Sequence, residues 1–440
     1  MVRGLRLGRS DPETEKATTD LESNQETLEN SPENSTAVSN AVPDGGLRAW
    51  VQVLLMHIVF MNTWGVANGY GVFQEYYTQH LPESQSTISW IGSVQVCLLF
   101  LVGVVAGRIT DAGYFRIVFT VGVLLQLLGI FLASLTSKYW QIFLSQALCV
   151  GLGNGFAFVP SLTVMASYFK QNRAFAVGLA AAGGGTGGLI YPTLINQLVN
   201  NDSIGGYPWT MRIMGFLMLA TYIPCVIWFA PRLPARRGGQ FIDTAAFKEV
   251  PFILFALSQF TSFWGLYFAF FFMGTFARDI IGIAQPINLV MVLNGCGIVG
   301  RILPNFLADR WTGPLNMLIP LNLGAAILIY CWSAIRTESG LYVFAILYGI
   351  LAAALQALYP ALATTMTPDP DKTGTRVGMI FSFVSISTLT GPFISGQLIT
   401  RNDGNYLYAQ LFAGSSVLVA TLLALALRTC RAGLKLNVKV

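Results

Sequence analysis

The chain has 440 residues, of which 54% are hydrophobic and 11% are charged, and its formal net charge is +5. Soluble domains carry about 25% charged residues, so this composition excludes an ordinary soluble enzyme and a disordered protein. The small positive charge also argues against a nucleic-acid partner. A membrane-spanning helix needs about 20 apolar residues, and the chain is long enough for twelve such helices.

Residues 1–47 are mostly polar and rich in Glu, Ser, Thr and Asn. They lack the apolar stretch that a secretory signal peptide requires. A segment of this composition buries too little apolar surface to offset the entropy lost on ordering. We therefore expect a disordered cytosolic tail over residues 1–47.

Long apolar stretches bounded by Gly, Pro or charged residues follow the tail. They are about twice as long as a membrane β-strand and do not alternate, so we expect transmembrane helices. The first six would form an N-terminal bundle over residues 48–230, with helices at 49–73, 90–110, 115–136, 140–165, 174–199 and 209–230.

A polar and basic segment at residues 231–249 is predicted to be a cytosolic linker. It is followed by a C-terminal six-helix bundle over residues 250–429, with helices at 250–276, 286–308, 315–335, 341–366, 374–400 and 406–428. Residues 430–440 would form a second cytosolic tail. The predicted fold is an all-α integral membrane protein with twelve transmembrane helices in two pseudo-symmetric bundles.

Lys and Arg residues set the expected orientation, because they concentrate on the cytosolic side of membrane proteins. If the N-terminus is cytosolic, most of these residues lie on the inner connections, and the outer ones carry Lys138, Arg278, Arg336 and Arg401. We therefore expect a multi-pass protein of the cell membrane with both termini in the cytosol. The sequon at Asn201 would then face outward and could be glycosylated.

The two halves of the chain resemble each other at an offset of 200 residues. Pro160 and Pro360 match, as do Gly178 and Gly378, and Pro192 and Pro392. A duplicated membrane unit implies a twofold axis normal to the bilayer, with a binding site between the halves and alternating access by rocking.

A short motif recurs at the cytosolic ends of the second and eighth predicted helices. Gly107-Arg108-Ile109 is repeated as Gly300-Arg301-Ile302, and Asp111 and Asp309 follow near the helix ends. Each aspartate could bind a nearby helix N-terminus and pair with Arg116 or Arg310. We expect these four charged residues to form a conformational latch, in preference to ordinary solvated helix ends. The motif resembles the loop motif of the major facilitator superfamily.

The glycine run Gly183–Gly188 lies within the fifth predicted helix. Glycine in a membrane helix permits close packing and also bending. Both interpretations, a tight contact and a hinge, remain open from the sequence.

Two further motifs resemble signatures of the monocarboxylate porter family, especially its fungal branch. One precedes the first helix and contains Asp44, Gly45, Gly46 and Trp50. The other joins the fourth and fifth helices and contains Tyr168, Phe169, Lys170, Arg173 and Gly178. The resemblance covers residues 44 to 430 and implies a twelve-helix transporter of small organic acids, vitamins or secondary metabolites.

The residues that animal members of that family use for proton coupling are largely absent. The resemblance matches Arg301 to the family's arginine in the eighth helix, whereas Asn68 stands at the lysine position and Gly297 at the aspartate position. This departure argues against proton–monocarboxylate symport of the animal kind.

Arg301 is the leading candidate for substrate binding. An arginine deep in a membrane helix should face a wet cavity, and its fork of donors suits a carboxylate. The alternative is a structural arginine bound to helix carbonyls. Further polar candidates lie in other predicted spans: Asn68, His57, Asn154, Gln259, Asn294, Gln356 and Tyr359. His57 is the deep group that titrates near neutral pH, although a packing role is the more ordinary interpretation.

These observations predict a secondary active transporter of a small organic anion or metabolite, with protons as a candidate coupling ion. We expect a monomeric core in the lipid bilayer, without metal or cofactor, because the Cys and His spacing of zinc and redox sites is absent. The alternatives are a transporter-like nutrient sensor and a membrane enzyme. The short C-terminal tail argues against the sensor, and the lack of clustered His, Asp and Ser in the spans argues against the enzyme.

Overall fold

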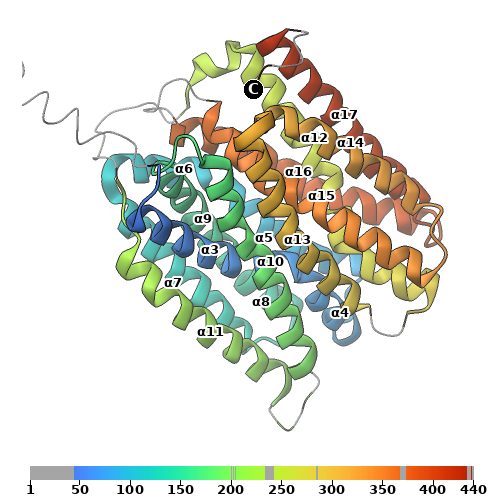
Figure 1. Cartoon of the computed structure of the whole chain (residues 1–440). Coiled ribbons are helices and arrows are strands. Elements are labelled where there is room, and N and C mark those ends of the chain that lie inside the picture. Colours follow the sequence, from blue (N-terminus) through green and yellow to red (C-terminus); the bar gives the residue numbers. More distant parts are fainter. Residues whose placement is uncertain are drawn as a thin grey trace, which may run out of the picture. The chain divides into compact units, whose positions relative to one another are not determined.

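Helices account for nearly all of the residues that the structure describes. The computed structural model (Figure 1) describes residues 44–199, 201, 203, 205–232, 242–283, 286–366, 373–433 and 438, and within these residues it contains helices but no strand. The expected N-terminal tail up to residue 43, residues 233–241 of the linker and most of the last seven residues lie outside the described part.

The first half of the chain contains long helices that are interrupted at several points. Its elements are α3 (Leu47–Asn68), α4 (Tyr70–His80), α5 (Gln85–Leu101), α6 (Gly103–Ile109), the π-helix η1 (Thr110–Tyr114), α7 (Phe115–Ala133), α8 (Tyr139–Ile142), the π-helix η2 (Phe143–Val150), α9 (Gly151–Ala166), α10 (Arg173–Leu198) and α11 (Gly206–Trp228).

The second half begins with a short 3-10 helix in the linker. Its elements are η4 (Thr244–Lys248), α12 (Val250–Phe276), the π-helix η5 (Ala277–Ile281), α13 (Ile287–Leu307), the π-helix η6 (Ala308–Thr312), α14 (Pro314–Trp332), α15 (Glu338–Thr365), α16 (Thr373–Arg401) and α17 (Leu407–Ala432). The expected helices are therefore present, with ends that differ by a few residues.

Eleven helices in the described residues are long and apolar enough to cross a membrane. One of them, Thr87–Ala133, has 47 residues, and at 1.5 Å per residue it would be about twice as long as the bilayer core is thick. Gly113 divides it, because its φ of 91° is non-helical. The two parts, α5–α6 and α7, are separate crossings, so twelve segments result.

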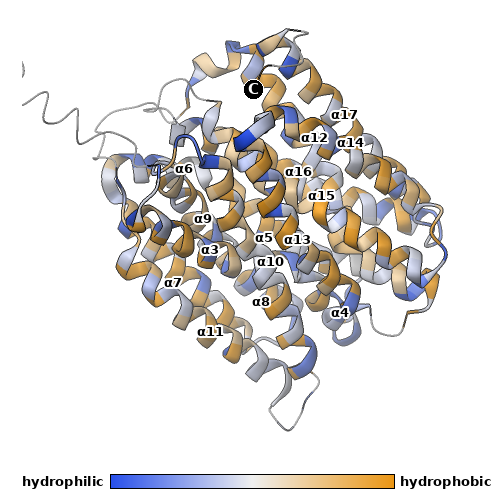
Figure 2. Cartoon of the chain, in the orientation of Figure 1, coloured by the Kyte–Doolittle hydropathy of each residue, from blue (hydrophilic) through white to orange (hydrophobic). Residues whose placement is uncertain are grey.

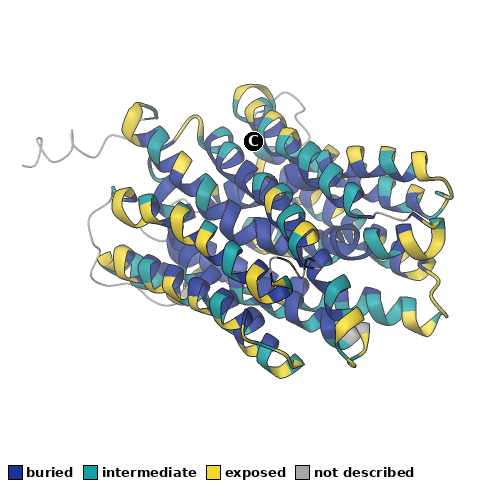
Figure 3. Cartoon of the chain, turned by 90° about the horizontal axis from the view of Figure 1, so that it is seen from below, coloured by how far each residue is buried: buried dark blue, intermediate teal, exposed yellow. Residues whose placement is uncertain are grey.

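Apolar side chains also cover the outward faces of the helices. Figure 2 shows hydrophobic residues along nearly every helix, and Figure 3 shows buried positions gathered in the interior. The exposed residues of α7 and α11 include Leu124, Leu128, Phe216 and Ile223. Exposed apolar surface on this scale is unusual for a soluble protein and fits helices that contact lipid.

The halves are joined by two helix–helix interfaces, which we call seams. Helix α10 of the first half packs against α13 of the second, and α16 of the second half packs against α5 and α6 of the first. The fifth helix of each half thus meets the second helix of the other half, as expected for a duplicated unit.

The glycine run in α10 provides the close contact at one seam. A Cβ atom on Gly183 would lie 1.9 Å from the His57 carbonyl oxygen of α3, and one on Gly188 would lie 2.5 Å from the Asn294 side chain of α13. The run therefore lets α10 approach a helix of its own half and a helix of the other half at once.

Candidate functional site

Arg301 lies on α13 and is enclosed at the seam with α10. Its exposed fraction is 2%. The guanidinium Nη2 donates to Gln356 Oε1 on α15 at 2.5 Å, and Nη1 has no hydrogen-bond partner within the described part of the chain. No carboxylate in that part forms an ion pair with it. A buried charge without a counter-charge is costly, so the arrangement favours an anion that could pair with Nη1.

Glycines surround the guanidinium. A Cβ atom on Gly297 would lie 2.8 Å from Nη1, and one on Gly185 would lie 3.4 Å from the same atom. The sequence comparison placed an aspartate of the animal porters at position 297. Here that position offers space for the arginine and supplies no negative charge.

The environment of Arg301 differs from the wet cavity that the sequence led us to expect. Three delineated cavities are lined by other residues, and the side chain itself is buried. The physical reason is that contacts between the halves close the molecule on both sides of this residue, as described below.

An aromatic cluster links the two halves beside the arginine. The rings of Trp64 on α3 and Tyr267 on α12 are nearly parallel, at 8°, with centroids 6.2 Å apart. Phe100 and Phe158 pack on Trp64, and Phe263 packs on Tyr267. Trp64 is also a neighbour of Arg301, because a Cβ atom on Gly184 would contact both side chains.

Several predicted polar residues are buried without satisfied side chains. Both amide atoms of Asn154 and of Gln259 lack partners among the described residues, as do Asn68 Nδ2 and Gln356 Nε2. Most buried polar groups in proteins are hydrogen-bonded, so each of these amides could bind a polar molecule or water.

Other predicted candidates have local structural partners instead. The Leu179 carbonyl accepts a hydrogen bond from His57 Nδ1 at 3.0 Å, and Thr186 lies 3.3 Å from Nε2. Asn294 Nδ2 donates to the Val290 carbonyl of its own helix. Their positions argue for packing roles.

Tyr359 also belongs to a structural network. Its hydroxyl lies 3.1 Å from Ser258 Oγ and accepts a hydrogen bond from Asn322 at 3.1 Å. The hydroxyl is therefore engaged within the second half, although the ring packs on Phe263.

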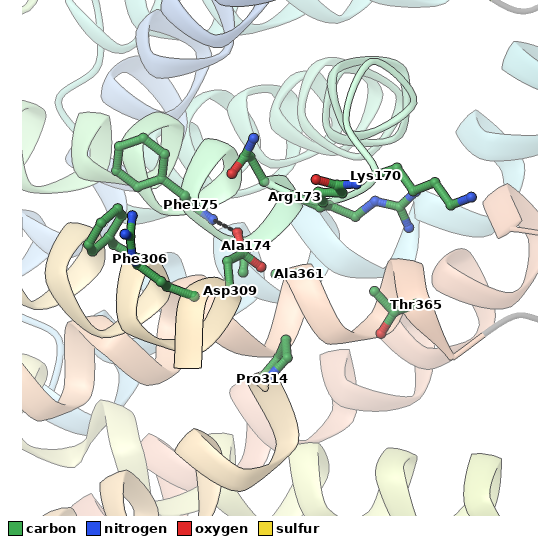
Figure 4. Close-up of a pocket in the computed structure, with 12 residues that line it drawn as sticks. Lys170, Arg173, Ala174, Phe175, Phe306, Asp309, Pro314, Ala361 and Thr365 are labelled. Carbon is green, nitrogen blue, oxygen red and sulfur yellow. Dashed lines mark hydrogen bonds between the residues drawn. The ribbon is translucent and has the colours of Figure 1, made fainter. Parts of the chain in front are cut away.

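The expected latch aspartates lie at the N-termini of helices from opposite halves. Asp309 Oδ2 accepts a hydrogen bond from the Phe175 backbone N–H at 2.7 Å, at the start of α10 (Figure 4). A Cβ atom on Gly374, at the start of α16, would lie 2.8 Å from the Asp111 carboxylate. Both aspartates sit in the corresponding π-helices η1 and η6, which supports the internal repeat.

The expected pairing of these aspartates with Arg116 and Arg310 stays a prediction. Both arginines are exposed. The contact that the structure gives for Asp309 is with the N-terminus of α10 in the other half.

The two motifs that resemble porter signatures contact each other. Asp44 Oδ1 accepts hydrogen bonds from the backbone N–H groups of Lys170 and Gln171, at 2.5 and 2.7 Å. Trp50 packs on Phe169 with centroids 5.2 Å apart. Gly46 has a φ of 84°, which permits the turn that brings Asp44 to the loop, while Gly45 has open space around it.

The second motif also reaches the other half of the chain. Arg173 Nη1 donates to the Thr364 carbonyl of the second half at 3.2 Å, whereas Tyr168 donates to the Ala230 carbonyl of its own half at 3.0 Å. A cavity of about 540 Å³ lies beside this loop, lined among others by Lys170, Arg173 and Asp309 (Figure 4). Gly178 packs against the Arg301 carbonyl, 2.3 Å from where its Cβ would lie.

An ion pair joins the two halves at the end of the molecule opposite to Asp111 and Asp309. Glu75 on α4 accepts a hydrogen bond from Arg278 on η5 at 3.2 Å, and Arg278 also binds Asp279 at 3.0 Å. The sequence analysis placed Arg278 on an outer connection but did not identify the pair. Residues from α3–α4 and α12 also meet nearby, as Tyr70 packs on Phe271.

A partly buried ion cluster between the linker and α16 was likewise missed. Arg376 on α16 donates to Asp243 at 2.9 Å and to both carboxylate oxygens of Glu249 at 2.8 and 2.6 Å. The signal available in the sequence was a basic residue in the first turn of the eleventh expected helix, together with two acids in the linker before the seventh.

Comparison with known proteins decides the family. Residues 54–335 match the family described as "Major Facilitator Superfamily". The chain belongs to this superfamily. An "MFS-type transporter" of Gibberella zeae is 42% identical over 86% of each chain. The "Aspyridones efflux protein apdF" of Emericella nidulans is 32% identical over 88% of this chain and 79% of its own.

Solved structures support the same fold. The human organic anion transporter MFSD10 aligns with a TM-score of 0.66 and 14% identity, over 86% of this chain and 98% of its own. The transporter FucP in its outward conformation aligns with a TM-score of 0.65 and 16% identity, over 86% of this chain and 99% of its own. This member of the Major Facilitator Superfamily is therefore a multi-pass membrane transporter, and the expectation that it is not an enzyme is confirmed.

Proposed function

We propose that the protein exports a small organic anion by alternating access, with Arg301 as the group that receives the anion. The observation that carries the proposal is the enclosed guanidinium of Arg301, with Nη1 unpartnered in the described residues and no carboxylate paired to it. An arginine fork binds carboxylates through parallel hydrogen bonds. Gln356 would hold the guanidinium in place through its bond to Nη2.

Export is favoured over uptake by the names of relatives. The "Agnestins efflux protein AgnL12" of Paecilomyces divaricatus is 32% identical over 83% of each chain, and the aspyridones relative is also named as an efflux protein. The names of these relatives give aspyridones and agnestins as the exported compounds, so a secondary metabolite is a better candidate than a simple monocarboxylate. The fungal monocarboxylate porter branch remains our proposal for the subfamily, because of the two motifs joined by Asp44.

The contacts between the halves suggest how access alternates. Asp111 and Asp309 would close the cytosolic side at the N-termini of α16 and α10, and the Glu75–Arg278 pair would close the outer side. Rocking of the halves about Arg301 would break one set of contacts while keeping the other. The present structure has both sets in place.

Further parts of the proposal concern topology. We propose that the six-helix bundles at 48–230 and 250–429 move as units joined by the linker at 231–249, with both termini cytosolic and a monomeric core. Asn201 would then lie outside, within reach of glycosylation. Protons remain a candidate coupling ion, although the partners of His57 do not favour a role for it.

Uptake of radiolabelled benzoate into inside-out membrane vesicles tests the anion site. We expect Arg301→Ala to reduce the initial rate at least tenfold, since a charge-assisted hydrogen bond contributes about 1.5–3 kcal/mol. Arg336→Ala is the matched control, because Arg336 is exposed and bonds backbone carbonyls. Wild-type uptake by the Arg301→Ala protein at equal membrane levels would refute the site.

A further inference from the structure

Several buried polar side chains on the helices that meet between the halves have unpartnered hydrogen-bond donors. Five side-chain atoms that can only donate lack partners within the described residues: Trp64 Nε1, Asn68 Nδ2, Gln95 Nε2, Arg301 Nη1 and Gln356 Nε2. The amide oxygens of Asn294 and Asn305, close to Arg301, also lack partners there, so donors outnumber acceptors in this set. The unpartnered amides of Asn154 and Gln259 can both donate and accept, as can the hydroxyl of Tyr267. No carboxylate belongs to this group, so it favours a ligand rich in acceptor oxygens and disfavours a cation.

These polar residues are placed one helical turn from aromatic rings. Asn68 follows Trp64 by four residues on one stretch of helix, Asn154 precedes Phe158 by four, and Gln259 precedes Phe263 by four. Residues four apart share a helix face. The donors and the rings therefore point in the same direction, toward the interface between the halves.

The rings themselves form a bridge across that interface. Trp64 and Phe100 come from the first half, whereas Tyr267 and Phe263 come from the second, and Trp64 and Tyr267 are parallel. At a centroid distance of 6.2 Å they leave no room for a third ring between them. Separation of the halves would move the two rings apart and expose two flat aromatic faces beside the guanidinium.

We propose that the transported anion is a planar, conjugated acid rich in oxygen. Its ring system would stack on Trp64 and Tyr267, its ionised oxygen would pair with Arg301, and its remaining oxygens would accept hydrogen bonds from Trp64 Nε1 and Gln356 Nε2. Saturated and short aliphatic carboxylates would bind weakly. This inference rests on the proposed role of Arg301 and adds the chemical class of the substrate.

Ligand-induced thermal stabilisation of the purified full chain in detergent tests the inference, because stabilisation at increasing ligand concentration yields Kd. The probes are 2-naphthoate, cyclohexanecarboxylate and the neutral 2-naphthamide. We expect 2-naphthoate to bind about tenfold more tightly than cyclohexanecarboxylate, as stacking on two rings adds to the charge interaction. It should also bind more tightly than 2-naphthamide.

Variants of Trp64 and Tyr267 separate the contribution of the aromatic ring to binding from that of the hydrogen-bond donor. Trp64→Leu and Tyr267→Leu should each remove most of the preference for 2-naphthoate over cyclohexanecarboxylate, whereas Tyr267→Phe, which keeps the ring, should retain it. Trp64→Phe should weaken 2-naphthoate binding several-fold through loss of the indole N–H. Trp332→Phe is the matched control, because Trp332 is also buried with an unpartnered Nε1 but packs on Phe268 and Phe344 within the second half.

The possible results distinguish a failure of the planar-acid proposal from a failure of the proposed anion site at Arg301. Equal affinity for 2-naphthoate and cyclohexanecarboxylate, a preference that survives both leucine variants, or no stabilisation by 2-naphthoate up to its solubility limit would overturn the planar-acid proposal. If Arg301→Ala still abolished binding of cyclohexanecarboxylate in that case, the anion site would stand. Unchanged binding of 2-naphthoate by Arg301→Ala would instead refute the anion site itself.

Discussion

The residue at position 297 determines whether Arg301 has an acidic neighbour, and this affects the role that the arginine can play. Gly297 leaves the guanidinium of Arg301 close to backbone, without the charge that an acidic side chain would supply. A permanent internal ion pair would satisfy the arginine in every conformation. Without it, the unpartnered Nη1 is available to a charge that arrives with the substrate and leaves with it.

The partners of His57 lead to a prediction at the same scale. Because a carbonyl oxygen can only accept, Nδ1 donates the hydrogen bond to Leu179, and Nε2 faces the Thr186 hydroxyl. A glutamine amide can donate to the same carbonyl. We expect His57→Gln to keep transport within about twofold of wild type, measured as initial rates from pH 5.5 to 7.5.

A charged replacement provides the comparison for that experiment. His57→Lys places a permanent charge beside α10 and should lower both expression and transport. Loss of transport in His57→Gln with a displaced pH profile would show that this histidine carries the coupled proton after all.

At the scale of elements, the glycine run of α10 sets the distance between three helices. A Cβ atom on Gly183 would overlap the backbone carbonyl of His57, which is not a flexible side-chain end that could move aside. Helix α10 must therefore shift away from α3 if any side chain is added. Tight packing, one of the two interpretations open from the sequence, is what these distances support.

We expect Gly183→Ala to destabilise the protein by about 1–3 kcal/mol, because overpacking forces backbone movement. The measurement is thermal unfolding of the purified protein. Gly295→Ala on α13 is the matched control, since its Cβ would lie 3.7 Å from Leu189 in ordinary contact, and it should unfold at the wild-type temperature. Equal unfolding temperatures for the two variants would mean that the seam is looser than these distances indicate.

The elements were more predictable from the sequence than the site. Hydrophobic length located all twelve crossings, because a helix in lipid must satisfy its own backbone. It could not locate the π-helices η1 and η6, which depend on packing between the halves, or the break after Asn68. Within the site, Arg301 and Gln356 were predicted as separate candidates, and the structure joins them.

Side-chain partners across the seam left no signal in a single sequence. Trp64 is one apolar residue among many in its helix, and its stacking on Tyr267 requires knowledge of how α3 and α12 face each other. For Asp309 the sequence indicated a helix N-terminus as partner but could not identify Phe175. The local sequence pattern therefore predicts which kind of interaction a residue can form. The tertiary contacts determine its actual partner.

At the scale of the whole molecule, contacts on both sides of Arg301 hold the halves together in an occluded arrangement. At the end of the molecule that we propose to be cytosolic, the contact is a carboxylate at a helix N-terminus, which contributes about 0.3–1 kcal/mol near the surface and up to ~2 kcal/mol when partly buried. The outer contact is an ion pair with exposed fractions of 44% and 39%, and such pairs contribute about 0–1 kcal/mol. Neither is strong enough to prevent exchange between inward-open and outward-open states.

Removal of either contact should therefore increase the population of the conformation that is open on the side where the contact was lost. We expect Asp309→Asn to raise the labelling rate of a cysteine at Ala361 about fivefold and to lower that of a cysteine at Val72, since ~1 kcal/mol corresponds to about a fivefold change. Both positions are buried in this structure, with exposed fractions of 2% and 9%, and they line the cavity beside Asp309 and the cavity beside Glu75 respectively.

Glu75→Gln should produce the reverse pattern, with faster labelling at Val72→Cys and slower labelling at Ala361→Cys. The measurement uses a membrane-impermeant maleimide on purified protein in which the exposed Cys331 and Cys430 are replaced by serine. Opposite responses require that the two contacts belong to one rocking motion, because a change that only loosens the fold would accelerate labelling at both positions. Acceleration at both sites in either variant would show that these residues stabilise the structure without controlling access.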